Sequence, residues 1–296
     1  AILDRMPNAQ GFDYYFGPLG ANDGGTVKFH HNNEPAGQTT NMGSLTRLYT
    51  NKAIDYLDNK RNSDQPFLLY LAHTMMHTNI DASPKFKGNS EGGLYGDVVE
   101  EFDYETGRLL DVLDKQGLRD NTLVIYTSDN GPWRGMKGSL FEGGIRVPAF
   151  MRRPKTIAPG SIDDPITSLD LVASAIGAAG AEAAGLDGID LSPWIGASPP
   201  APDRSICWRR GPVAAIRDGD GMKLIRVEGE GSMLFDLDTD PGEMVNLAGR
   251  RPAEVVRLLA GLAAWEHGVV EPRWTTGEYW RRNLLKKHRM DVRGRE

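Results

Sequence analysis

Apolar residues along this chain fall into two kinds of pattern, which predict two kinds of element. Short continuous apolar runs between turn-forming residues indicate buried strands, here at 67–72, 123–127 and 147–151. Apolar residues spaced three and four apart indicate helices, here over 44–60, 95–117 and 168–179. Strands that alternate with helices of this length predict an α/β fold with a mainly parallel sheet flanked by helices.

The pattern changes after the proline-rich stretch at 193–202, which indicates a domain boundary. Short apolar runs separated by Gly and Asp predict an antiparallel meander, with strands at 205–208, 213–217, 222–227 and 233–236. A helix over 254–265 closes the unit. We therefore expect a large α/β domain over 1–198 and a small antiparallel subdomain over 199–296. Residues 18–43, rich in Gly, Asn and Thr, are expected to form a long loop.

Composition limits the choice of function. Of the 296 residues, 40% are hydrophobic and 25% charged, as in ordinary globular proteins. The formal net charge of −6 gives no reason to expect a nucleic-acid partner. Basic residues do gather within 281–295, where a helix with a solvated face is favoured over a binding arm. A transmembrane helix is not expected, because no run of 18 apolar residues occurs.

The middle of the chain carries the residues best suited to chemistry. Asp129 and Asn130 follow the expected strand at 123–127, at the end of a strand where α/β sheets bind ligands. Their carboxylate and amide oxygens suit Ca²⁺ or Mg²⁺. Lys137 follows among glycines that permit close approach of a ligand, and its ammonium suits an anionic oxygen. The segment therefore predicts a cation site beside an anion site.

Each of these residues also has a plainer interpretation. Asp-Asn-Gly is a common turn, and a lysine is usually a solvated surface residue. Glu142 and Arg146 are four residues apart and are favoured to form a structural pair. Arg134 is left unassigned between substrate and solvent.

Two histidines follow the expected strand at 67–72. His73 and His77 stand where a side chain can donate to an anion or act as a general acid. Their spacing would suit a zinc pair on a helix, but Thr74 stands where zinc sites of that type carry glutamate. The alternative for each histidine is a satisfied polar residue at the edge of the core.

Together these segments resemble type I sulfatases of the alkaline-phosphatase superfamily. The resemblance rests on the histidine segment, on Ser-Asp-Asn-Gly at 128–131, on the run from Lys137 to Pro148, and on the motif at 234–247. It implies that His77 and Lys137 are catalytic and bind the sulfate together with His73. It also implies that Asp129 and Asn130 are two of the metal ligands. Asn79 and Met76 depart from the family pattern, which has proline there in many members.

The resemblance also implies features that this sequence does not contain. The family's nucleophile is a formylglycine made from Cys or Ser in a Cys-x-Pro/Ala-x-Arg motif, and Cys207, the one cysteine, is followed by Trp-Arg-Arg. The family's paired N-terminal aspartates and its Lys-x-His motif are likewise not found. We therefore expect the chain to be the C-terminal two-thirds of a sulfatase, with Cys207 packed in the small subdomain.

The function expected of the intact parent is hydrolysis of small-molecule or carbohydrate sulfate esters with formylglycine and Ca²⁺, or Mg²⁺, while this chain alone is expected to be inactive. The family suggests a periplasmic or secreted enzyme. Two alternatives stay open: a phosphoester or phosphonate hydrolase of the same superfamily, and a fragment that binds without catalysis.

Overall fold

The computed structural model of the chain describes residues 3–60, 65–131, 137–195, 202–271 and 277–289. Backbone contacts divide the chain into two compact units, residues 1–122 with 153–156, and residues 123–152 with 157–296. The expected domain boundary at residue 198 lies outside the described residues and stays a prediction. Among the described helices, none is both long and apolar enough to cross a membrane.

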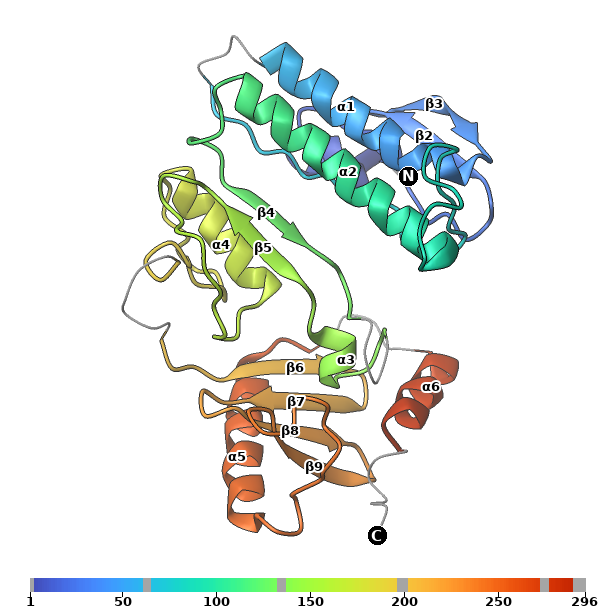
Figure 1. Ribbon diagram of the computed structural model, residues 1–296. Coiled ribbons are helices and arrows are strands. Elements are labelled where there is room, and N and C mark those ends of the chain that lie inside the picture. Colours follow the sequence, from blue (N-terminus) through green and yellow to red (C-terminus); the bar gives the residue numbers. More distant parts are fainter. Residues whose placement is uncertain (1–2, 61–64, 132–136, 196–201, 272–276, 290–296) are drawn as a thin grey trace. The chain divides into compact units, whose positions relative to one another are not determined.

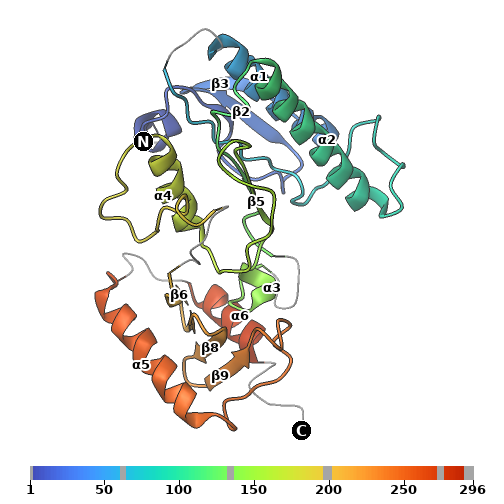
Figure 2. The same ribbon diagram turned by 60° about the vertical axis from the view of Figure 1, so that its left-hand side comes forward.

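The first unit packs two long helices against a small antiparallel sheet (Figure 1). The helices predicted from periodicity over 44–60 and 95–117 are α1 (Leu45–Lys60) and α2 (Gly93–Lys115), and they lie side by side in both views (Figures 1 and 2). The sheet consists of β1 (Phe16–Pro18), β2 (Val27–His31) and β3 (Glu34–Thr39). Short 3-10 helices span Leu3–Arg5, Pro7–Gln10 and Met42–Ser44. The core joins residues of β2, α1 and α2, including Val27, Phe29, Leu45, Tyr49 and Val98.

This sheet corrects the expectation of a long loop over 18–43. Val27 and Phe29 are buried while Lys28 between them is exposed, which is the two-residue alternation of a strand. A tight turn at Asn32 and Asn33 joins β2 to β3, and Asn32 has a φ of 53°. Asn tolerates this left-handed conformation better than most residues, so a hairpin forms where composition suggested a loop.

Parallel pairing of the strands expected at 67–72, 123–127 and 147–151 is not found among the described residues, where every strand pairing is antiparallel. β4 (Val124–Thr127) pairs with β5 (Ala149–Arg152), and both lie close to their predicted positions. Residues 67–72 belong to no helix or strand, and Leu68 and Tyr70 are 69% and 76% exposed. An apolar run becomes a strand only when another backbone pairs with it, and sequence pattern alone does not supply that partner.

The second unit contains the predicted meander. Strands β6 (Ile206–Arg210), β7 (Val213–Arg217), β8 (Met222–Val227) and β9 (Gly231–Asp236) pair antiparallel in chain order. Helix α5 (Pro252–Gly268) covers one face through Leu258 and Leu262 (Figure 2). The other face packs against Leu140, Phe141 and Leu285.

Three further helices complete this unit: α3 (Glu142–Ile145), α4 (Ser168–Ala178) and α6 (Glu278–Arg289). The helix predicted over 168–179 is confirmed as α4. Asp170 in its first turn accepts hydrogen bonds from the backbone of Thr167 and from Arg204, as a helix start favours. The helix expected in the basic tail is α6, and its Leu284, Leu285 and His288 are buried.

Candidate functional site

Asp129 and Asn130 lie where the sequence predicted, directly after the carboxyl end of β4. Asp129 is exposed and Asn130 is half-buried, so solvent reaches both residues. The hydroxyl of Ser128 donates to the backbone oxygen of Asn130 at 3.2 Å, which ties the turn together. Two adjacent oxygen-bearing side chains fit one side of a hard-cation site.

Gly131 fixes this turn against α3. Its N–H donates to the backbone oxygen of Gly144 at 3.3 Å. A Cβ at Gly131 would lie only 2.5 Å from the oxygen of Arg146 and 2.7 Å from that of Gly143, so only glycine allows this approach. The position of Asp129 and Asn130 therefore depends on the position of α3.

Lys137 lies on the same unit, at the start of the segment leading into α3, and its side chain is exposed. Lys287 of α6 donates to the backbone oxygen of Lys137. A Cβ at Gly138 would meet Nη1 of Arg210 at 2.9 Å and Nζ of Lys287 at 3.2 Å. Three basic side chains thus belong to residues gathered around Gly138, and such positive charge favours an anionic ligand. Arg134 lies outside the described residues.

The tail helix holds this segment through a buried histidine. Nε2 of His288 accepts from the N–H of Leu140 at 3.0 Å, and its Nδ1 lies 2.7 Å from the backbone oxygen of Leu284. Because that oxygen can only accept, Nδ1 carries the proton and the ring is neutral. The ring also stacks on Phe141, with 5.4 Å between centroids.

Glu142 has the structural role that the sequence favoured, but its recorded ion-pair partner is Lys223 of β8, 2.7 Å away. The same ammonium lies 2.9 Å from Oε1 of Glu243. All three side chains are buried. Sequence spacing did not predict this cluster, because Glu142 and Glu243 lie 81 and 20 residues from Lys223 in the chain.

His77 lies in the first unit, on a loop held by Asn22 and Asp23. Its Nδ1 is 3.0 Å from the backbone oxygen of Thr78 and 3.1 Å from Oδ1 of Asp23. Both neighbours accept, so Nδ1 donates and Nε2 is the atom that can face a substrate. His77 and Lys137 belong to different compact units, and their expected convergence on one anion stays a prediction.

His73 packs into the core of the first unit. Its ring makes edge contacts with Tyr49 and Phe102, at centroid distances of 5.9 and 4.8 Å. Burial lowers the pKa of His73 to about 4, so the ring is neutral near pH 7. This environment matches the alternative expected for His73 from the sequence, a polar residue at the edge of the core. A contact of His73 with substrate stays a prediction.

Cys207 packs beside the core between the sheet and α5, as expected. Burial, with a smaller contribution from Glu266, raises the pKa of its thiol to about 11. A thiol in this state is a poor nucleophile.

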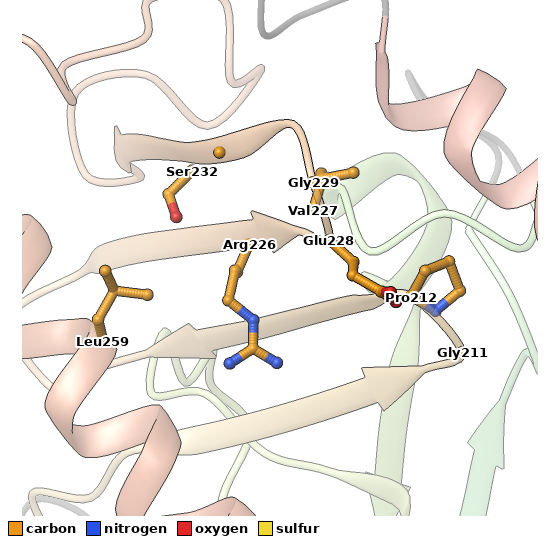
Figure 3. Close-up of a pocket in the computed structure, with 9 residues that line it drawn as sticks. Gly211, Pro212, Arg226, Val227, Glu228, Gly229, Ser232 and Leu259 are labelled. Atoms are coloured by element: carbon orange, nitrogen blue, oxygen red, sulfur yellow. The ribbon is translucent and has the colours of Figure 1, made fainter.

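A cavity of about 470 Å³ opens on the sheet of the second unit, lined by Gly211, Pro212, Arg226 and Leu259 among others (Figure 3). Figure 3 shows the Arg226 side chain between Leu259 of α5 and the turn at Gly211 and Pro212. Both terminal nitrogens of Arg226 are bound by Glu266 at 2.8 Å. The cavity thus offers no unpaired arginine to an anion, and none of the predicted site residues lines it.

The donor atoms of Asp129 and Asn130 fit calcium by type, since both are hard oxygens. Calcium takes about six to eight oxygen ligands, so further ligands must join these two. Among the described residues, no group of three or more His, Cys, Asp or Glu side chains is placed to hold a metal ion.

Comparison with known proteins decides the family. The family model described as Sulfatase matches residues 3–181, more than half of the chain. The chain belongs to the sulfatase family. The match includes His73, His77, Asp129, Asn130 and Lys137.

Individual sulfatases agree with this assignment. Rat (Rattus norvegicus) steryl-sulfatase is 40% identical over 180 residues, which cover 53% of this chain and 31% of the relative. Human (Homo sapiens) arylsulfatase A is 32% identical over 251 residues, covering 70% of this chain and 49% of the relative. The matched region thus spans about a third to a half of these curated sulfatases.

Solved structures extend the likeness to nearly the whole chain. The crystal structure of Ps i-CgsB in complex with k-i-k-neocarrahexaose superposes with a TM-score of 0.77 at 25% identity. That superposition covers 98% of this chain and 74% of the other. The expected alkaline-phosphatase-like α/β fold with an antiparallel C-terminal subdomain is therefore confirmed.

Proposed function

We propose that this chain forms part of an enzyme that hydrolyses sulfate esters through a formylglycine nucleophile and a divalent cation. The observation that carries the proposal is the sulfatase family match over 3–181. The matched region includes Asp129, Asn130 and Lys137, which all belong to the second compact unit. The formylglycine motif is not in this sequence, so in this proposal residues beyond it supply the nucleophile.

Asp129 and Asn130 would hold Ca²⁺, or Mg²⁺, through their side-chain oxygens. The cation, when bound, would neutralise part of the charge on the sulfate. Lys137 would bind a sulfate oxygen with its ammonium, where charge develops in the transition state. Nε2 of His77 would bind the same group or protonate the leaving alcohol oxygen, because Nδ1 is occupied by Thr78 and Asp23.

The positive charge of the residues around Gly138 favours a substrate with more than one anionic group. The substrates named for similar proteins differ widely, as the names rat steryl-sulfatase, mouse N-acetylgalactosamine-6-sulfatase and the neocarrahexaose complex of Ps i-CgsB indicate. We propose a sulfated carbohydrate, because Arg210 and Lys287 add cationic groups beside the lysine that would bind the hydrolysed sulfate.

The test compares sulfate release with phosphonate release. The complete protein and this 296-residue chain are each incubated with an aryl sulfate, a sulfated oligosaccharide and an aryl phosphonate monoester. We expect sulfate release by the complete protein and none by the chain alone. Preference for the phosphonate ester would replace the proposal by the phosphonate hydrolase, and turnover by the chain alone would show that the nucleophile lies within it.

A further inference from the structure

Lys223 is a charged residue in the interior of the second unit. It lies on β8, its side chain is fully buried, and Ile225 and Val227 on the same face of the strand belong to the core. Its ammonium contacts Oε1 of Glu142 at 2.7 Å and Oε1 of Glu243 at 2.9 Å. Lysine is rarely buried completely, and then it is paired.

The cluster is costly to keep for stability alone. Two buried carboxylates share one ammonium, and burial raises the pKa of Glu243 although Lys223 opposes this shift. Apolar residues often replace a buried ion pair without loss of stability, whereas removal of one partner leaves an uncompensated charge. A role beyond stability would explain why a strand in an apolar core carries Lys223.

The cluster of Lys223, Glu142 and Glu243 is connected through Glu142 to the segments that carry the cation ligands and Lys137. Oε2 of Glu243 accepts from the N–H of Glu142 at 2.6 Å, so backbone and side chain of Glu142 are both held. Glu142 begins α3, whose Gly144 binds the N–H of Gly131 beside Asn130. In the other direction Phe141 and Leu140, which are buried on the same sheet, connect Glu142 to Lys137.

We propose that Lys223 is a positioning residue. By holding Glu142 in place, it fixes the position of the cation ligands Asp129 and Asn130 relative to the anion-binding Lys137. The inference rests on the proposed function for what this segment binds. It assigns the antiparallel subdomain a part in the reaction, because β8 supplies Lys223 and the loop after β9 supplies Glu243. The lysine acts through Glu142 and does not touch substrate.

The first experiment measures backbone protection in the 296-residue chain and needs no activity. Hydrogen exchange is followed in residues 129–131 and 138–145 of the wild type and of Lys223→Met, which keeps the length of the side chain without its charge. The matched control is Arg226→Met, which removes an ion pair with Glu266 on the α5 face of the same strand. We expect exchange to rise at least about 10-fold in both segments for Lys223→Met alone. Equal exchange in the two variants would overturn the proposal.

The second experiment separates positioning from stability in the complete protein. The variant Lys223→Met/Glu142→Gln removes one charge of each sign and should regain most of the unfolding midpoint lost by Lys223→Met. We expect both variants to keep a kcat reduced at least about 10-fold with little change in KM, because misplaced groups fail in the transition state. Return of kcat together with the unfolding midpoint would show a purely structural role and overturn the proposal.

The two failures remain distinguishable. If the wild-type protein releases no sulfate from any ester, the proposed function fails, while the exchange measurement still decides whether Lys223 fixes this segment. If the wild type is active and exchange in the segment does not respond to Lys223→Met, the positioning role alone is wrong.

Discussion

Replacing His288 by leucine tests how the tail helix holds the segment after Lys137. The substitution keeps a side chain of similar size but removes Nε2, which accepts from the N–H of Leu140 at 3.0 Å. His288 is fully buried and Leu140 is 5% exposed, so water cannot easily take the place of Nε2. Leaving a buried donor unsatisfied costs about 1–3 kcal/mol.

This cost converts into a measurable exchange rate. Since about 1.4 kcal/mol is a factor of ten, the amide of Leu140 should exchange roughly 5- to 150-fold faster in His288→Leu than in the wild type. The assay is residue-resolved hydrogen exchange of this chain at pH 7. His267→Leu is the matched control, because His267 lies exposed in the last turn of α5. Unchanged exchange at Leu140 in His288→Leu would refute the reasoning.

Three further predictions concern other parts of the second unit. Asp170→Asn should lower the free energy of unfolding, measured with urea at pH 7, by about 1.5–3 kcal/mol. Burial alone would raise the pKa of Asp170, but Arg204 and backbone donors hold it below its usual value. The difference in unfolding free energy between wild type and variant should therefore vanish as the pH falls through that lowered pKa. Gly131→Ala should cost about 1–3 kcal/mol in thermal unfolding, since backbone oxygens lie 2.5 and 2.7 Å from its Cβ, whereas Gly160→Ala, with nothing within 4 Å, should be nearly neutral. Asp129→Ala in the complete protein should remove most bound calcium by elemental analysis, and unchanged metal content would contradict the ligand assignment.

Sequence pattern predicted those elements that depend on local turns or on one apolar face of a helix or strand. The helices α1, α2, α4 and α5 follow the 3.6-residue repeat, and β6 to β9 follow turn residues that return the chain at once. The pattern failed at residues 67–72, where strand formation depends on a distant partner. It failed at β2 and β3 because composition outweighed the alternation of Val27 and Phe29, although the Asn32–Asn33 turn was a usable signal.

The candidate site was predictable where side chains suited to metal binding directly follow a predicted strand in the sequence. Asp129 and Asn130 were found because they follow β4 directly. The supporting residues were not, because Lys223, Glu243 and His288 reach the segment from a strand, a loop and a helix that are up to 148 residues away from their partners in the sequence. The available signal for Lys223 was a lysine between apolar neighbours within the strand predicted at 222–227.

The most direct test of the sulfatase site is the activity of Lys137→Ala in the complete protein. We measure kcat/KM for an aryl sulfate in the wild type, in Lys137→Ala and in Lys137→Arg. Loss of one preorganised charge-stabilising group predicts a fall of about 10²-fold or more for Lys137→Ala. Lys137→Arg should recover only part of it, because a planar guanidinium does not replace a compact ammonium. A Lys137→Ala variant with nearly wild-type kcat/KM would show that Lys137 is a surface lysine and would contradict the account.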